Sequence, residues 1–246
     1  MKFSRVKRLV GSAAVERLAN VRVAVFGLGG VGSWAAEALV RSGVGHITMV
    51  DADVVAESNI NRQLPAMVST VGRPKTEVMR EHLLDINPEA KINAVCELYT
   101  AQTAEQFNLN EFDYVIDAID SLSDKALLIL NTTKSSARLF SSMGAAMKMD
   151  PARIAVDEFW NVKGCPLAAA LRRKFKRTGL FPRRKFRCVF SDELVPNREE
   201  AMDATTIGDT AMNFGKVAYN GALCHITAIF GMTLASLVIR DAIKNL

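Results

Sequence analysis

The chain has 246 residues, 49% of them hydrophobic, and a formal net charge of +5 at pH 7. This length and composition predict one large domain with a full core, and the basic excess favours a polyanionic partner. Its four cysteines have no C-x-x-C spacing, which excludes the usual zinc site or redox pair and fits a reducing compartment.

The first 20 residues lack a continuous apolar run, so we predict a helical segment and no secretory signal. Strands and helices then alternate. The patterns predict strands at 22–27, 46–51, 91–99, 113–120 and 137–144, with helices at 33–43 and 72–88 among them. Apolar strands separated by helices indicate an α/β fold, Rossmann-like, with a mostly parallel sheet and helices on both faces.

The pattern changes after residue 145, so we divide the single predicted domain into segments 1–20, 21–145 and 146–246. The last segment is predicted to be a mixed β/α extension with strands at 153–160 and 186–194. Between these strands, residues 172–187 carry nine Lys or Arg and no acid. Residues 221–239 contain no charged side chain and are long enough to cross a bilayer, but we favour a core or dimer-interface helix.

The first strand leads into Gly27, Gly29 and Gly32, which form a G-x-G-x-x-G motif before a helix. Glycines in such a turn let phosphate oxygens approach the backbone, and the helix N-terminus offers free N–H groups. Asp51 ends the next strand, where a dinucleotide fold places its ribose-binding acid. These features alone favour a nicotinamide or flavin enzyme.

Further charged residues favour a triphosphate ligand over a dinucleotide. Arg62 follows Asp53 by nine residues, and Lys75 begins the next predicted helix. Asp120 ends the fourth predicted strand, where it is a candidate Mg²⁺ ligand. The carboxyl ends of neighbouring strands face one crevice, where cations can offset the charge of ATP. The alternative is that Arg62 and Lys75 are solvated surface charges.

The stretches GLGGVGS, DADVVAESNINRQ, GRPK and DAIDS resemble the superfamily of ubiquitin-activating-type (ThiF-like) adenylyltransferases. The resemblance implies that ATP and Mg²⁺ are the cofactors and that a substrate carboxylate attacks the α-phosphorus. It implies catalytic roles for Arg62, Lys75 and Asp120, with Asp120 as the metal ligand. The implied nucleotide-binding set is Gly27, Gly29, Gly30, Gly32, Asp51, Asp53, Ser58, Asn59, Asn61, Arg62, Lys75, Asp120 and Ser121.

A narrower resemblance is to the tRNA threonylcarbamoyladenosine dehydratases, and it spans almost the whole chain. It rests on Arg8, Leu9 and Gly11 and on the stretches VIDAIDS, MGAAMKMDPARIAV, CPLAAALRRKF and CVFSDE. The resemblance implies that ATP is used to cyclise threonylcarbamoyladenosine in the tRNA anticodon loop to an oxazolone form. It also implies a homodimer.

The basic segment suits an RNA substrate, because RNA binding requires phosphate contacts. We expect its phenylalanines, Phe175, Phe181 and Phe186, to be mainly core anchors. The cysteines at 165, 188 and 224 are expected to pack as small apolar side chains. The predicted tRNA footprint is Arg172, Arg173, Lys174, Lys176, Arg183, Arg184 and Lys185.

Three other functions remain open from the sequence. One is an adenylyltransferase for a ubiquitin-like sulfur-carrier protein, although these usually bear two C-x-x-C pairs that hold zinc. The others are a non-catalytic nucleotide-binding or membrane-associated scaffold and a nicotinamide enzyme. We expect a cytoplasmic protein that binds no zinc and no DNA, with membrane association through 221–239 as the alternative. A component of a cysteine-desulfurase system is a further candidate partner.

Overall fold

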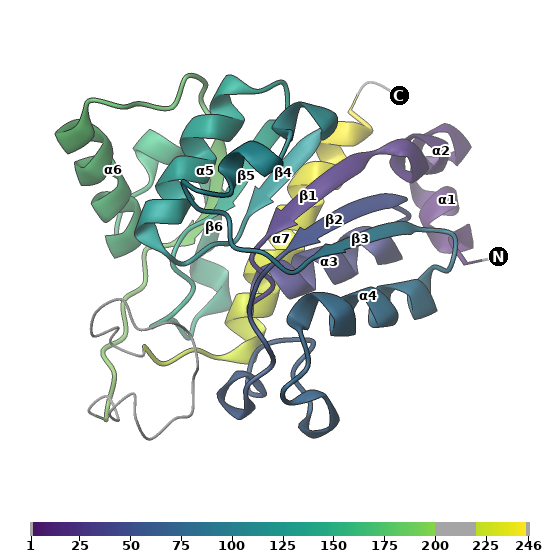
Figure 1. Cartoon of the computed structure of the whole chain (residues 1–246), viewed down its shortest axis with the longest axis horizontal. Helices are drawn as coiled ribbons and strands as arrows, with labels where there is room; N and C mark the ends of the chain where they lie inside the picture. The colour runs from purple at the N-terminus through teal and green to yellow at the C-terminus, as the bar shows by residue number, and fades with distance from the viewer. Residues whose placement is uncertain (1, 200–219, 245–246) are drawn as a thin grey trace.

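The structure is a computed structural model, and it describes residues 2–199 and 220–244. One seven-stranded sheet organises the fold (Figure 1), with the strand order β3-β2-β1-β4-β5-β7-β6. The strands are Arg22–Phe26 (β1), His46–Val50 (β2), Lys91–Val95 (β3), Tyr114–Asp117 (β4), Arg138–Ser142 (β5), Ile154–Glu158 (β6) and Arg187–Ser191 (β7). All neighbours pair in parallel except β6 and β7, which are antiparallel.

Helices cover both faces of the sheet, as the sequence predicts for a parallel sheet. They are Ser4–Val10 (α1), Ser12–Asn20 (α2), Gly32–Arg41 (α3), Lys75–Ile86 (α4), Leu122–Lys134 (α5), Pro166–Thr178 (α6) and Cys224–Ala242 (α7). Side chains of α3, α4 and α7 join one hydrophobic cluster, and those of α5 and α6 join another on the opposite face. The prediction of an α/β fold is therefore confirmed.

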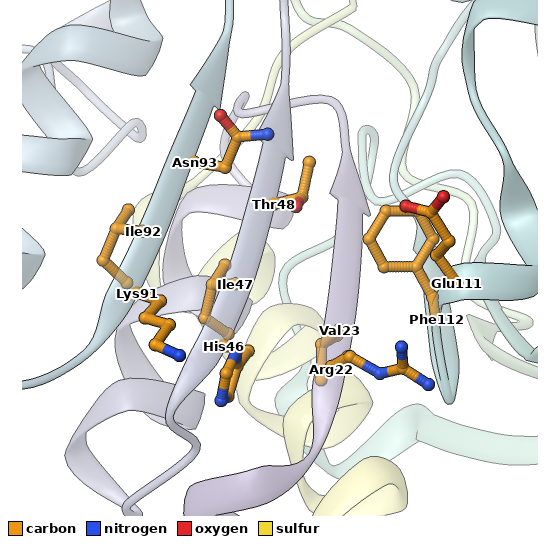
Figure 2. A pocket seen from close by; sticks show the side chains of 10 residues that line it. All are labelled: Arg22, Val23, His46, Ile47, Thr48, Lys91, Ile92, Asn93, Glu111 and Phe112. Atoms are coloured by element: carbon orange, nitrogen blue, oxygen red, sulfur yellow. The ribbon is translucent and has the colours of Figure 1, made fainter.

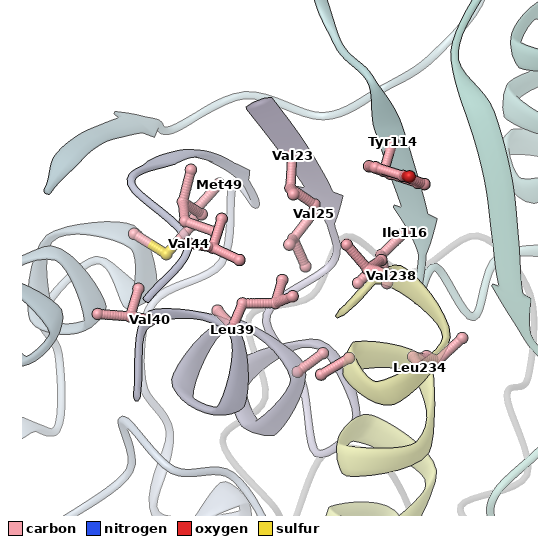
Figure 3. Packing of buried hydrophobic residues seen from close by; sticks show 14 of the residues in the cluster. Val23, Val25, Leu39, Val40, Val44, Met49, Tyr114, Ile116, Leu234 and Val238 are labelled. Atoms are coloured by element: carbon pink, nitrogen blue, oxygen red, sulfur yellow. The ribbon is translucent and has the colours of Figure 1, made fainter. Parts of the chain in front are cut away.

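The larger cluster explains the apolar segment near the C-terminus. Ile226, Phe230, Leu234 and Val238 are spaced at helical intervals along α7 and are fully buried. Figure 3 shows Leu234 and Val238 packed beside β-strand residues such as Val25 and Ile116. By length and composition α7 is the one helix of the described residues that could span a membrane, yet it lies in the core. Of the predicted core or dimer-interface helix, the core packing of one face is confirmed.

Helix α6 begins and ends where its sequence specifies. Pro166 occupies the first turn, where its missing N–H costs nothing, and Gly179 ends the helix with a φ of 69°. Its buried face consists of Ala168, Leu171 and Phe175, while Arg173 between them is exposed and Arg172 lies over the ring of buried Phe159.

All seven strands end earlier than predicted, β3 and β4 among them. Strand β4 stops at Asp117 instead of residue 120, because the Asp117 carboxylate accepts a hydrogen bond from the Ile119 N–H at 3.2 Å and turns the chain out of the sheet. Strand β3 stops at Val95 instead of residue 99, and Tyr99 packs its ring edge-on against Phe26. Both departures occur at the carboxyl edge of the sheet, where the predicted site lies.

Candidate active site

The glycine turn joins β1 to α3 at the centre of the sheet, next to β4. A Cβ on Gly27 would lie 2.7 Å from the Ala118 carbonyl oxygen, and one on Gly32 would lie 1.8 Å from the Gly27 oxygen. Gly27 also has a φ of 89°. These two positions require glycine, because any side chain would separate β1, β4 and α3. Gly29 differs, since the nearest atom to its Cβ position is Nε2 of Gln63 at 3.8 Å.

The turn leaves backbone donors free. Within the described part of the chain, the N–H groups of Gly29, Gly30 and Val31 donate no hydrogen bond. Helix α3 begins at Gly32 without a side-chain cap, so its positive end faces the same space. A helix N-terminus of this kind binds phosphate. Gly30 also has a packing role, because its Cβ position is 3.0 Å from Oγ1 of Thr227 in α7.

Asp51 connects the end of β2 to this turn. One carboxylate oxygen accepts the Leu28 N–H at 2.5 Å, and the other accepts the Asp53 N–H at 2.8 Å. Burial raises the pKa of Asp51, while the positive charge of Lys75 acts in the opposite direction. The predicted ribose-binding acid therefore lies directly beside the phosphate turn.

Lys75 and Asp53 are 22 residues apart in sequence but in contact. Lys75 Nζ is 2.7 Å from a carboxylate oxygen of Asp53, and the Lys75 side chain is only 5% exposed. An antiparallel bridge between Val54 and Pro74 brings the two residues together. Lys75 is thus held at the N-terminus of α4, on the same edge of the sheet as the glycine turn, and is not a solvated surface charge.

Arg62 is held in the loop after β2 by its neighbours. Its Nη1 donates to the Ser58 carbonyl at 3.0 Å and to Oδ1 of Asn61 at 2.8 Å. Trp34 of α3 donates its indole N–H to the Arg62 carbonyl at 3.2 Å, which connects this loop to the helix that follows the glycine turn. Asn59 is buried and accepts the Ala56 N–H at 3.2 Å.

Both asparagines of this loop therefore hydrogen-bond to other protein groups. Asn59 accepts from the Ala56 N–H, and Asn61 donates to the Ala222 carbonyl at 3.0 Å. Their contacts with a nucleotide stay predictions.

Asp120 and Ser121 follow β4, and both are exposed. Asp120 makes no hydrogen bond with the described residues, so its carboxylate is free to meet a ligand. The segment that carries it touches the glycine turn through Ala118 and Gly27. No group of three or more His, Cys, Asp or Glu side chains suited to a metal occurs among the described residues. A single carboxylate fits Mg²⁺, which takes most of its remaining ligands from phosphates and water.

Sequence reasoning missed a buried charged cluster behind Asp120. Asp117 at the end of β4 and Lys125 of α5 are both fully buried, and their charged atoms are 3.0 Å apart. Ser141 of β5 donates to Asp117 at 2.7 Å. Burial raises the pKa of Asp117, and Lys125 counteracts it. The available signal was an acid at the end of a wholly apolar strand, with a lysine eight residues later on the buried face of a helix.

The basic segment is divided between free and engaged side chains. Arg184 donates to the carbonyl oxygens of Thr132, Thr133, Ser135 and Ala137 at the C-terminal end of α5. Arg172 donates to the Phe159 carbonyl at 3.1 Å. Arg173, Lys176, Arg183 and Lys185 are exposed, and Lys174 reaches Oγ of Ser123 at 3.4 Å, near the start of α5.

The aromatic and cysteine expectations are confirmed in part. Phe175 and Phe186 are buried anchors, but Phe181 is 48% exposed because it follows the end of α6, and its ring lies 6.2 Å from that of Trp160. Cys165 and Cys188 are buried, and burial raises the pKa of the Cys188 thiol. Cys224 is exposed, contrary to expectation, because it begins α7 before the buried face of that helix starts.

A cavity of about 360 Å³ lies elsewhere, at the amino ends of β1, β2 and β3 (Figure 2). Arg22, His46 and Lys91, the first residues of these strands, lie side by side in register. Asp113 pairs with Arg22 and offsets part of the charge. The cavity is about 15 Å from the glycine turn by strand length, at the opposite edge of the sheet, and shares no residue with the predicted nucleotide site.

Two known proteins resemble this chain over different lengths. The chain is 38% identical over 246 residues to the tRNA threonylcarbamoyladenosine dehydratase of Bacillus subtilis, covering 100% of this chain and 96% of that protein. It is 36% identical to the molybdopterin-synthase adenylyltransferase of Escherichia coli over 135 residues, which cover 55% of this chain and 53% of that protein.

Solved structures of a dehydratase also match this chain over nearly its full length. The crystal structure of E. coli tRNA N6-threonylcarbamoyladenosine dehydratase in complex with ATP superposes with a TM-score of 0.84 at 34% identity, covering 99% of this chain and 94% of that one. Its complex with AMP gives a TM-score of 0.86 at 35% identity, with the same coverage. Residues 3–245 match the sequence profile of the ThiF family. The chain therefore belongs to the ThiF family.

Proposed function

We propose that this chain is an ATP-dependent tRNA threonylcarbamoyladenosine dehydratase, which closes the modified adenosine of the anticodon loop to its cyclic oxazolone form. The observation that carries the proposal is the extent of similarity. The dehydratase of B. subtilis matches the whole chain, including the basic segment, whereas the carrier-protein adenylyltransferase matches 55% of it. The greater extent of the match to the dehydratase favours its substrate over a carrier protein.

The first chemical step is adenylation of the threonyl carboxylate. A carboxylate oxygen attacks the α-phosphorus of ATP, and pyrophosphate leaves. The free N–H groups of Gly29, Gly30 and Val31 face the phosphates, and Lys75 and Arg62 offset charge that gathers in the transition state. Asp51, beside Leu28, receives the ribose hydroxyls.

The second step closes the ring. The carbamoyl oxygen attacks the activated threonyl carbonyl, AMP leaves with the original carboxylate oxygen, and a carbamoyl nitrogen loses a proton. Because both reacting groups belong to one side chain of the base, positioning supplies much of the rate. No covalent enzyme intermediate is needed, in keeping with the burial of Cys165 and Cys188.

Mg²⁺ is the proposed metal, held by Asp120 together with the nucleotide. When bound, it supplies charge neutralisation at the phosphates. Asp120 suits this role because its carboxylate is exposed and free of hydrogen bonds within the described residues. Ser121 is the adjacent polar side chain and completes the predicted nucleotide set.

The tRNA footprint lies along α6 and the loop that follows it. The exposed residues Arg173, Lys176, Arg183 and Lys185 are its phosphate contacts, and Lys174 connects this surface to the start of α5, near Asp120. Arg172 and Arg184 support the surface by holding it to Phe159 and to α5. We further propose a cytoplasmic homodimer, as the family resemblance implies.

The decisive assay is mass spectrometry of nucleosides after tRNA bearing threonylcarbamoyladenosine is incubated with the protein, ATP and MgCl₂. The proposal requires a product that is lighter by one water, with AMP and pyrophosphate released. ATP–pyrophosphate exchange that depends on a carrier protein and not on modified tRNA would overturn the proposal in favour of carrier-protein activation.

Two sets of variants test the site assignment. Arg62→Ala and Asp120→Ala should lower adenylation about a hundredfold while the fold is kept. Near-parental turnover in both would refute these assignments. Replacing Arg173, Lys176 and Lys185 by Ala should flatten the salt dependence of tRNA binding by about two units and leave ATP binding unchanged. An unchanged salt slope would place the RNA elsewhere.

A further inference from the structure

The buried pair formed by Asp117 and Lys125 requires an explanation beyond stability. Both side chains are completely inaccessible to solvent. Removing two charges from water costs as much as or more than their attraction returns, so buried pairs rarely stabilise a fold more than apolar residues of the same size. The best attested role of such pairs is to fix one arrangement of the chain.

The pair forms hydrogen bonds with the backbone of a single residue, Ile119. One carboxylate oxygen of Asp117 accepts the Ile119 N–H at 3.2 Å, and Lys125 Nζ donates to the Ile119 carbonyl at 2.9 Å. The other carboxylate oxygen accepts Ser141 Oγ at 2.7 Å, which anchors the pair to β5. Both backbone polar groups of Ile119, which belong to two consecutive peptide units, are therefore held by buried side chains.

Ile119 lies between the end of the sheet and the proposed metal ligand. The sheet ladder ends with the Ala118 N–H, which donates to the Phe26 carbonyl at 2.8 Å. Beyond it, the Ser121 carbonyl accepts the Lys125 N–H at 2.9 Å, at the first turn of α5. Only Asp120 lies between Ile119 and Ser121, and its side chain has no partner among the described residues.

The same segment supports the phosphate turn. The Ala118 carbonyl oxygen is 2.7 Å from the position of a Cβ on Gly27, so the glycine turn and the segment 118–121 are in direct backbone contact. A shift of Ile119 would therefore change the position of Asp120 relative to the phosphates.

We propose that Asp117 and Lys125 are positioning residues, which hold the backbone of Ile119 so that Asp120 meets the metal ion bound to the nucleotide. This inference rests on the proposed role of Asp120 at the nucleotide site. It does not depend on which carboxylate the enzyme adenylates.

The test uses two double variants that differ in one hydrogen-bond donor. Asp117→Asn with Lys125→Gln keeps an amide donor for the Ile119 carbonyl, whereas Asp117→Asn with Lys125→Met keeps a similar shape without a donor. Both remove the two charges together, so neither leaves an unpaired buried charge. Glu37→Gln is the matched control, because Glu37 is also buried and ion-paired but lies between α3 and α4 outside the site.

The readout is the gain in ATP affinity on adding MgCl₂, measured by calorimetry without tRNA and compared with affinity in EDTA. All variants should bind ATP in EDTA within about twofold of the parent, because the glycine turn and Lys75 are intact. The methionine variant should lose the Mg²⁺-dependent gain, as should Asp120→Ala. The glutamine variant and Glu37→Gln should keep the gain.

An undiminished gain in the methionine variant, or in Asp120→Ala, would overturn the proposal. If the methionine variant does not fold, amide hydrogen exchange of the parent protein is the test. The Ile119 amide should be as protected as the amides of β4, and rapid exchange at Ile119 would refute the proposal. Because no arm contains tRNA, failure of the dehydratase assignment leaves these measurements unaffected.

Discussion

Gly231→Ala tests how the C-terminal helix supports the phosphate turn. Gly231 lies in the middle of α7, where it contacts the first turn of α3. A Cβ there would lie 2.3 Å from the Val31 carbonyl oxygen and 2.9 Å from the Ala35 nitrogen. Ordinary contacts begin at 3.4 Å, so α7 and the turn must separate by about 1 Å.

Two physical effects predict opposite signs for this substitution. Helix propensity alone favours alanine over glycine by about 0.5–1 kcal/mol. Overpacking against backbone costs about 1–3 kcal/mol, because backbone atoms cannot rotate away as a side chain does. We expect packing to dominate and the melting temperature to fall by about 2–10 °C for a chain of this size. Because Val31 belongs to the glycine turn, ATP should also bind more weakly.

The assay combines thermal unfolding with calorimetric titration of ATP. Met232→Ala is the control, because Met232 is the next residue in α7 and is 41% exposed. It should change neither quantity appreciably. A Gly231→Ala protein that is more stable than the parent and binds ATP equally well would refute the close packing of α7 on α3.

Three further predictions concern the second half of the chain. Arg184→Ala should lower the melting temperature by about 2–8 °C, since the Arg184 guanidinium holds the end of α5. The control Lys185→Ala should alter only tRNA affinity, and equal thermal unfolding curves for the two variants would contradict this. Cys165 and Cys188 should resist alkylation in the native protein while the two exposed cysteines react, because burial covers both thiols and raises the pKa of Cys188. Mass spectrometry after iodoacetamide treatment checks this, and rapid labelling of the buried pair would contradict it. Burial lowers the pKa of Lys148, so in the alkaline range the unfolded chain binds more protons than the folded chain, and this group makes the free energy of unfolding rise with pH. Urea titrations of Lys148→Met at several pH values should lack that rise. The same dependence of the unfolding free energy on pH in variant and parent would refute it.

The sequence by itself determined the local elements and which residues of the predicted nucleotide site share one edge of the sheet. Alternation of apolar strands and helices specifies a parallel sheet, and the G-x-G-x-x-G turn requires glycine at positions where a Cβ would strike backbone. Gly27, Asp51, Lys75 and Asp120 could be placed together because the carboxyl ends of neighbouring strands share one edge. These are consequences of short-range pattern and of a general rule for open sheets.

Contacts between distant segments were decided only by the tertiary structure. The basic run gives no sign that Arg184 is bound to α5 while Lys185 is free, since both are positive residues in the same loop. Likewise, Asp117 and Lys125 read as ordinary residues of a strand and a helix, yet both are fully buried. Whether a charged side chain is solvated or engaged depends on which groups the fold brings within hydrogen-bond distance, and sequence spacing carries no information on that distance.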